Sequence, residues 1–289
     1  MIAIYATARS AERCLLAPYG MPELPEVETI RRQLEPQLVG ARLSGTWAFD
    51  SPKFLDAMLV EDQEVEALDR RGKYLITRLS SDVDLIVHLG MTGKVRVAPA
   101  GDPHDPYSRA RWRVDDDRIL SFDDVRRFGR IAVTTRDDHR ALTTLHHLGP
   151  EPFDPTLDDE RFWRSLRSTR RHIKTDLLSQ RPIAGVGNIY ADEALWRAGV
   201  HPADRTITRS KAYDLLDALR AVLAEGIEHG GTTLRDYVDA QGATGSHQHH
   251  LACYGRYDEP CERCGATLRR IVLDARTTTF CPSCQPRRR

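Results

Sequence analysis

The residues best suited to chemistry stand in the segment Met21-Pro22-Glu23, which reads like a second start of the chain. If Met21 is removed, the nitrogen of Pro22 becomes a free secondary amine, and an α-amino group titrates at roughly pH 8, close to neutrality. Such an amine can attack an aldehyde-like carbon and form a Schiff base, while the carboxylate of Glu23 moves the protons. The sequence therefore predicts Pro22 as a nucleophile and Glu23 as its acid–base partner.

The same segment can also be interpreted as a simple helix entry. Pro25 suits the first helical position, and Glu26 suits the positive end of the helix dipole. In a chain that begins at Met1, the nitrogen of Pro22 is an internal amide without an available lone pair. Residues 1–20 lack the continuous apolar core of a secretory signal. We expect them to be an extension from an upstream start codon, outside the active protein.

Four cysteines form two pairs, Cys261-x2-Cys264 and Cys281-x2-Cys284, separated by sixteen residues. This is the spacing of a four-thiolate zinc ribbon. A disulfide framework would need an oxidising compartment, and no export signal is visible. The pattern therefore predicts one structural Zn²⁺ ion, and the remaining cysteines, at positions 14 and 253, stand apart from it.

The overall charge argues against indiscriminate binding of polyanions, because 42 basic residues balance 42 acidic ones. Basic residues are nevertheless concentrated at 126–130 and from Arg161 to Lys174. Such runs are most often solvated faces, so they indicate nucleic acid only with independent support. No apolar run approaches the roughly 20 residues of a membrane span, and we expect a soluble protein without a membrane partner.

Two kinds of periodicity divide the chain. From about Ala41 to Val133 the pattern is mainly period-two, and 111–114 with 119–122 flank an acidic turn as in a β-hairpin. Helical spacing follows a proline-rich linker at 149–155. A glycine turn at 185–191 opens a helix whose free amides can receive a phosphate. We predict an α+β protein with a leading helix and an antiparallel β-sandwich at 21–150, a helical domain at 151–250 and a zinc finger at 251–286.

Six ordered motifs make the chain, from Met21 to about Gln285, resemble the bacterial formamidopyrimidine-DNA glycosylases, within the wider family that includes endonuclease VIII. In chain order these motifs are PELPEVE at 22–28, RRGKYL at 70–75, HLGM at 88–91, RRFG at 126–129, GVGNIYA at 185–191 and the four cysteines. The resemblance implies that the helical domain is a helix-two-turns-helix module. It also implies that DNA binds in the cleft between the domains.

The resemblance further implies roles for individual residues. It adds Lys73, which matches a phosphate-contacting position of the family, to the catalytic group. It puts Glu26 and Glu193 near the lesion pocket, although helix-terminal charge is an equally good interpretation of both. The residues implied to contact DNA are Asn188, Arg276 and His104, together with Met91, Arg126 and Phe128, which would fill the gap left by an extruded base. Met91 or Phe128 taken alone would be interpreted as core.

The implied function is base-excision repair. The enzyme would remove oxidised purines, such as 8-oxoguanine and formamidopyrimidines, through a Schiff base on Pro22, and would then cut the strand by β,δ-elimination as an AP lyase. Its partner would be double-stranded DNA with oxidised purines or abasic sites, bound by a monomer in the bacterial cytoplasm. Two alternatives stay open: an endonuclease VIII-like enzyme for oxidised pyrimidines, or a lesion-binding protein without chemistry if Met1 is the true start.

One loop departs from the family pattern. At 242–250, where many relatives have an aromatic residue before a glutamine, this chain has His247. We expect a long flexible loop there, in which His247, His249 and His250 are solvated and do not form a metal site.

Overall fold

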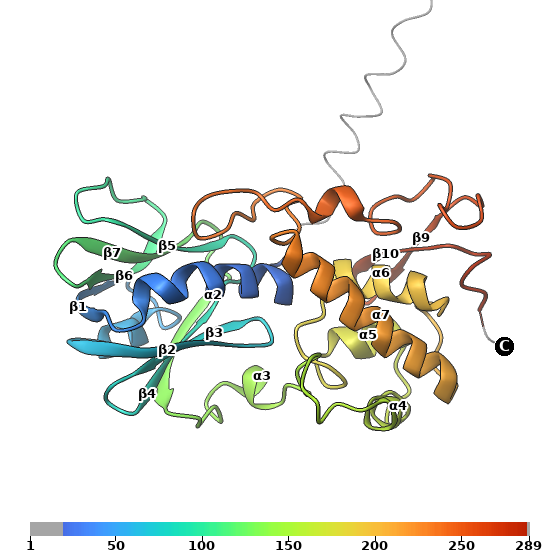
Figure 1. The fold of residues 1–289 in the computed structure, drawn as a ribbon, viewed down its shortest axis with the longest axis horizontal. Helices are drawn as coiled ribbons and strands as arrows, with labels where there is room; N and C mark the ends of the chain where they lie inside the picture. The colour runs from blue at the N-terminus through green and yellow to red at the C-terminus, as the bar shows by residue number, and fades with distance from the viewer. Residues whose placement is uncertain (1–19, 288–289) are drawn as a thin grey trace, which may run out of the picture.

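The computed structural model describes residues 20–287, so Cys14 and nearly all of the expected extension lie outside the described residues. Figure 1 shows the N-terminal β domain and the C-terminal helical domain side by side, with α2 starting next to the helical domain and running along the β domain. The helices are α2 (Leu24–Leu38), η1 (Leu55–Leu59), α3 (Thr143–His146), α4 (Asp159–Arg167), α5 (Ile173–Leu178), α6 (Asn188–Ala198), α7 (Arg209–Glu228) and η2 (His247–His250). The strands are β1 (Arg42–Ala48), β2 (Gln63–Arg71), β3 (Tyr74–Leu79), β4 (Val83–His88), β5 (Gly93–Pro99), β6 (Ser108–Val114), β7 (Arg118–Asp124), β8 (Arg130–Thr135), β9 (Arg269–Leu273) and β10 (Arg276–Phe280).

The N-terminal domain is an antiparallel β-sandwich, as predicted. Its strands follow the order β5-β7-β6-β1-β2-β3-β4-β8, and the short β1–β2 pairing joins two halves of four strands. Both halves contribute to one hydrophobic core, for example Leu43 from one and Leu85 from the other. The predicted hairpin is confirmed as the β6–β7 pair, with Arg113 opposite Ile119.

Helix α2 begins at the predicted helix entry and connects the two domains. Pro25 lies in the first turn, where its missing N–H removes no helical hydrogen bond. The carboxylate of Glu26 accepts a hydrogen bond from the Glu23 N–H at 2.8 Å. Val27 belongs to the core of the β-sandwich, whereas Leu24 belongs to the core of the helical domain. The first turn of α2 is therefore fixed between the two cores.

The C-terminal domain consists of packed helices and a small two-stranded sheet. Helix α6 packs against α7 and contacts β10, so it lies between the helical layer and the β9–β10 hairpin (Figure 1). Asp158 caps α4, because its carboxylate accepts from the Arg161 N–H at 2.6 Å. No helix within residues 20–287 is long and apolar enough to cross a membrane.

The prediction that the histidines of the loop 242–250 are solvated is wrong for His247. Residues His247–His250 form η2, and His247 is only 1% exposed, although His249 and His250 are exposed. The Thr233 N–H donates to the side-chain oxygen of Gln248 at 3.0 Å, which ties η2 to the segment after α7. These are tertiary contacts, so the polar composition of the loop does not reveal them.

Candidate catalytic and DNA-binding cleft

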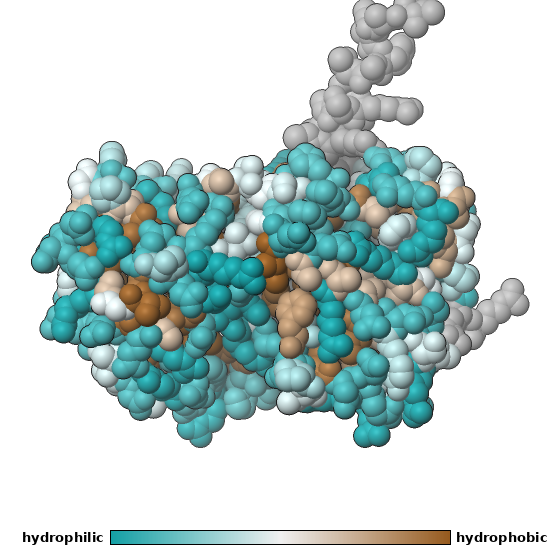
Figure 2. All heavy atoms as spheres, in the orientation of Figure 1, coloured by the Kyte–Doolittle hydropathy of each residue, from teal (hydrophilic) through white to brown (hydrophobic). Residues whose placement is uncertain are grey.

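A cleft of ≈ 1050 Å³ lies between the β-sandwich and the C-terminal domain. One wall comes from the β-sandwich, and the other comes from the start of α6 and the turn between β9 and β10. Figure 2 shows a mostly hydrophilic face on which hydrophobic side chains gather between the two halves of the molecule. The predicted site residues that line the cleft are Glu23, Lys73, Met91, Phe128, Asn188 and Arg276. The structure thus brings six of the proposed residues to one surface.

The carboxylate of Glu23 is held at the N-terminus of α6. It accepts hydrogen bonds from the Gly187 N–H at 2.6 Å and the Ile189 N–H at 2.9 Å. A Cβ atom on Gly187 would lie 2.2 Å from the Glu23 side chain, so only glycine allows this approach. These amides, which the sequence suggested could receive a phosphate, are therefore taken by Glu23. Burial raises the pKa of Glu23, while the charge of Lys73 and the amides oppose the rise.

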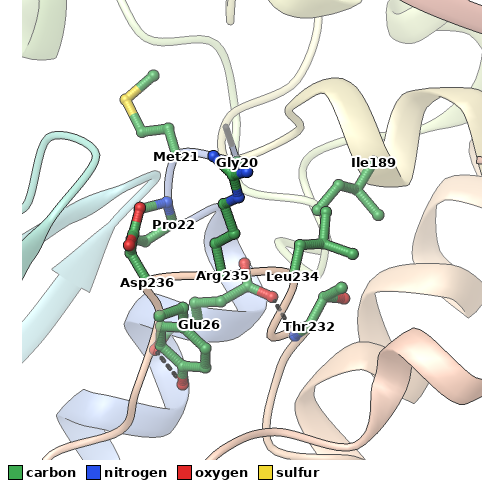
Figure 3. A pocket seen from close by; sticks show the side chains of 10 residues that line it. Gly20, Met21, Pro22, Glu26, Ile189, Thr232, Leu234, Arg235 and Asp236 are labelled. Carbon is green, nitrogen blue, oxygen red and sulfur yellow. Dashed lines mark hydrogen bonds between the residues drawn. The ribbon is translucent and has the colours of Figure 1, made fainter. Parts of the chain in front are cut away.

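A second, small hollow lies beside Pro22. Figure 3 shows Pro22 and Glu26 of the α2 segment facing the residues that follow α7. The Glu26 carboxylate accepts from the Thr232 N–H at 2.7 Å and from the Tyr190 hydroxyl at 2.8 Å. Burial, followed by the charge of Glu23, raises the pKa of Glu26 to about 7. Glu23 and Glu26 therefore form a pair of buried acids next to Pro22 whose charges interact.

Lys73 follows the turn between β2 and β3 and lines the cleft near Glu23. Burial lowers the pKa of Lys73, and the negative charges of Glu23 and Glu26 oppose that change. A lysine with a lowered pKa beside a buried carboxylate is suited to proton transfer as well as to binding a phosphate.

The turn that carries Lys73 is held from behind by Glu151 of the interdomain linker. The Glu151 carboxylate accepts from the Gly72 N–H at 2.7 Å, from Arg70 at 2.6 Å and from Arg71 at 2.8 Å. Gly72 has φ +55° and faces Leu148, so the turn requires glycine. The linker therefore fixes the backbone immediately before Lys73.

Met91 and Phe128 project into the cleft from two touching turns of the β-sandwich. A Cβ atom on Gly90 would lie 2.4 Å from the Gly129 N, so the turns are in direct contact. Phe128 is 50% exposed, which makes the core interpretation wrong for this residue. The guanidinium of Arg126 lies 4.8 Å from the centre of the Phe128 ring. An exposed aromatic ring that packs against a cationic side chain is suited to insertion between base pairs.

Asn188 and Arg276 lie together on the opposite wall. Asn188 is the first residue of α6, and its amide nitrogen donates to the Thr277 carbonyl at 3.1 Å. Arg276 begins β10 and lines the same cleft. His104 is not brought to this surface, because it lies exposed between β5 and β6 beside a different small hollow.

Glu193 lies outside the hollow beside Pro22, so the structure does not place it with Glu26. Its carboxylate accepts from the backbone N–H groups of Ala252 at 3.0 Å, Cys253 at 2.9 Å and Tyr254 at 2.7 Å. The side chain is buried and lines neither the cleft nor the hollow beside Pro22. Glu193 therefore joins α6 to the start of the cysteine-containing segment.

The four predicted metal ligands come together at the end of the chain. Their sulfur atoms lie within 4.8 Å of one another, with 3.5 Å between Cys264 and Cys281 and 4.0 Å between Cys261 and Cys284. Four thiolates at about 2.3 Å from a tetrahedral ion stand about 3.8 Å apart, so the donor set fits Zn²⁺. The Trp196 indole N–H donates to the sulfur of Cys261 at 3.3 Å and fixes the cluster against α6.

A buried ion pair beneath this wall was missed by the sequence analysis. Lys174, which the sequence counts as the end of a basic run, is fully buried, and its Nζ lies 2.6 Å from Asp192. It also donates to the Thr278 hydroxyl at 2.9 Å, and Asp192 accepts from the Thr279 N–H at 2.9 Å. The pair joins α5, α6 and β10. The sequence feature that could have indicated this pair is Asp192, a second acid next to Glu193 in a largely apolar helix.

Three family models cover most of the chain. Residues 21–131 match the formamidopyrimidine-DNA glycosylase N-terminal domain, residues 148–238 match the H2TH domain of the same glycosylases, and residues 258–287 match the zinc finger found in Fpg and IleRS. The chain belongs to the formamidopyrimidine-DNA glycosylase family. The exact boundaries given above for the domains stay predictions.

Individual members of this family are similar over nearly their full length. The formamidopyrimidine-DNA glycosylase of Herpetosiphon aurantiacus is 44% identical, with 92% of this chain and 100% of that protein covered. The crystal structure of MutM (Fpg) from Thermus thermophilus matches with a TM-score of 0.86 and 43% identity, covering 93% of this chain and 100% of that chain. A Lactococcus lactis Fpg in complex with DNA that contains an abasic site matches with a TM-score of 0.84 and 36% identity, covering 92% and 100%.

Proposed function

We propose that the protein is a bifunctional DNA glycosylase that removes oxidised purines and then cuts the strand, with Pro22 as its terminal nucleophile. One observation carries this proposal: Pro22 adjoins Glu23, a buried carboxylate held at the start of α6 and open to the interdomain cleft. Lys73 lines the same cleft. Membership of the formamidopyrimidine-DNA glycosylase family supports the reaction class.

The reaction begins when the neutral amine of Pro22 forms a bond to the anomeric carbon of the deoxyribose. The bond to the base breaks, its electron pair leaves with the base, and the base takes up the proton that the Pro22 nitrogen loses. Glu23 then opens the sugar ring by giving a proton to its oxygen, which leaves an iminium ion. The iminium makes the adjacent sugar proton acidic, so successive β- and δ-elimination expel the two phosphates. The raised pKa of Glu23 suits a carboxyl that must first donate a proton.

DNA binding divides between two kinds of contact. Lys73, Asn188 and Arg276 line the cleft with groups that can hold phosphates, which supply affinity without reading sequence. Met91, Arg126 and Phe128 fill the gap that an extruded base leaves in the duplex. His104 would contact a phosphate further along the duplex, because it lies away from the cleft.

The expected substrate is double-stranded DNA with oxidised purines or abasic sites. Structures of the Lactococcus lactis protein contain Fapy-dG DNA or DNA with an abasic site, which supports this choice. We further propose that the protein acts as a monomer in the bacterial cytoplasm.

One Zn²⁺ ion, held by Cys261, Cys264, Cys281 and Cys284, would serve only as a structural ion. Four thiolates complete its coordination and leave no position for a water or substrate. Its role is to stabilise the hairpin that carries Arg276, which lies between the two ligand pairs in the chain.

The proposal requires Pro22 to be a chain terminus, and this can be tested directly. We expect borohydride to trap a covalent adduct between DNA containing 8-oxoguanine and the form that begins at Pro22, with the peptide attached through Pro22 by mass spectrometry. The form that begins at Met1, with an intact N-terminus by mass, should give no adduct. Equal trapping by both forms would refute the proline assignment and point to a lysine such as Lys73.

A further inference from the structure

Two histidines, His229 and His247, lie next to the residues that bind the Glu26 carboxylate. No step of the proposed reaction uses them. His229 follows α7, and His247 begins η2, the segment that the sequence predicted to be flexible. Their Nδ1 atoms lie 3.0 Å apart. At this distance one ring donates an N–H to the lone pair of the other, so the contact requires at least one neutral imidazole.

The ring of His247 also supports a residue that binds Glu26 directly. The rings of His247 and Tyr190 stack with centroids 5.5 Å apart and an interplanar angle of 18°. The hydroxyl of Tyr190 donates to Glu26 at 2.8 Å. His247 therefore covers the face of the phenol whose other end holds the carboxylate.

The backbone of His247 reaches the same carboxylate by a second route. Its N–H donates to the Gly231 carbonyl at 3.1 Å. The residue after Gly231, Thr232, donates its N–H to Glu26 at 2.7 Å. Two of the three donors to Glu26 among the described residues are thus connected to one histidine.

The charged groups around the pair favour neutral imidazoles. His250 stacks on His229 with centroids 4.0 Å apart, and Arg197 is also near. The acid that faces the pair, Glu225, is already bonded to Arg197 at 2.6 Å. Burial, together with the neighbouring His229, lowers the pKa of His247 to about 4.

We propose that His247, locked to His229, is a positioning residue that keeps Tyr190 and Thr232 on Glu26 and keeps water away from that carboxyl. The pair thereby sustains the buried, coupled state of Glu26 and Glu23 beside Pro22. This inference rests on the proposed function only for its consequence in catalysis, because the effect on Glu26 can be measured without substrate.

The test is a titration of the Glu26 carboxyl by ¹³C NMR in the full chain, with the signal assigned by E26Q. In the unaltered protein we expect the midpoint near the pKa of about 7. H247A uncovers Tyr190, admits water and should lower the midpoint by about one pH unit or more toward the ordinary value. H247F keeps an aromatic face on Tyr190 but loses the bond to His229, so it should restore only part of the shift.

Three further variants keep the test decisive. H249A alters an exposed histidine of the same segment and should leave the midpoint unchanged. H229A should lower it, and H229Q, whose amide can still bond to the His247 ring, should lower it less. The proposal is overturned if the Glu26 carboxyl of folded H247A titrates with the midpoint of the unaltered protein. If H247A does not fold, H229A takes its place in this comparison. An equal shift of the midpoint in H249A would also overturn the proposal.

Catalysis provides a separate readout. The single-turnover excision rate at pH 7 should fall about tenfold in H247A and recover in part in H247F. If no form of the protein gives a borohydride adduct, the proposed function fails, but the titration still decides the role of His247.

Discussion

Helix α6 carries two buried glutamate sites that look alike and differ in use. At its first turn, the Gly187 and Ile189 amides hold Glu23, which lines the interdomain cleft. Further along, Glu193 holds three amides of the segment 252–254 and lines no part of that cleft. Burial raises the pKa of both carboxyls.

The difference between the two glutamates is access, not environment. A catalytic acid and a structural carboxylate can both be buried and can both accept hydrogen bonds from backbone amides. Both carboxyls have a cationic neighbour, Lys73 for Glu23 and Arg197 for Glu193. Only Glu23 lines the open cleft, and it directly follows a potential nucleophile, Pro22, in the chain. A raised pKa therefore identifies a functional carboxyl only when the group can reach a substrate.

The same substitution at both glutamates tests most directly whether their roles differ. Glu23→Gln should lower the single-turnover excision rate per folded molecule by about 10²- to 10⁴-fold, because the proton donor is lost. It should also cost stability, because its NH₂ group would face one of the two backbone amides that Glu23 accepts from. Glu193→Gln should destabilise the fold by about 1–3 kcal/mol, because its NH₂ group faces amide donors, with excision per folded molecule within a few-fold. Catalytic loss in Glu193→Gln at unchanged Tm would show that the two sites are not distinct.

The two gap-filling residues, Met91 and Phe128, provide the next largest effect. Met91→Ala with Phe128→Ala should slow excision of 8-oxoguanine from duplex DNA by about 10²-fold, since unstacking costs a few kcal/mol. Cleavage at a preformed abasic site should suffer less, and binding to undamaged duplex should stay within a few-fold. Single-turnover rates on both substrates decide between the roles.

The matched control for this double variant is Phe153→Ala, since Phe153 is 48% exposed and does not line the cleft. This control should leave both rates unchanged. Equal losses on the two substrates in the double variant would mean that Met91 and Phe128 support the catalytic pocket instead.

The smallest effect on chemistry is expected at the cysteine cluster. Cys264→Ser should release the metal and weaken binding to any duplex, damaged or not, by about tenfold, because loss of one phosphate-binding arginine costs a charge contact. Cys253→Ser is the control, since that thiol lies outside the cluster and donates to the Thr279 carbonyl at 3.2 Å. Metal content and binding to undamaged DNA are the measurements, and unchanged affinity after complete metal loss contradicts the prediction.

The fold could be predicted where local pattern determines it. Alternation in 41–133 indicated the sandwich, and cysteine spacing indicated the metal cluster. In these places a residue's partner lies a fixed number of positions away, so spacing is enough.

The site was predictable in composition but not in contacts. The motifs selected Glu23 and Lys73, which line the cleft, but they did not reveal that Glu193 binds the amides of residues 252–254. The Lys174–Asp192 pair and the burial of His247 were missed as well. Each of these depends on contacts between segments far apart in the chain, which helical or strand periodicity does not encode.

Glu151 connects the interdomain linker to the turn that carries Lys73. Glu151 belongs to the linker, and its side-chain carboxylate accepts hydrogen bonds from the Gly72 N–H and from Arg71, just before Lys73. A displacement of the linker would therefore also move the backbone next to Lys73. Glu151 thus connects the linker to the position of a cleft residue, although Glu151 itself does not line the cleft.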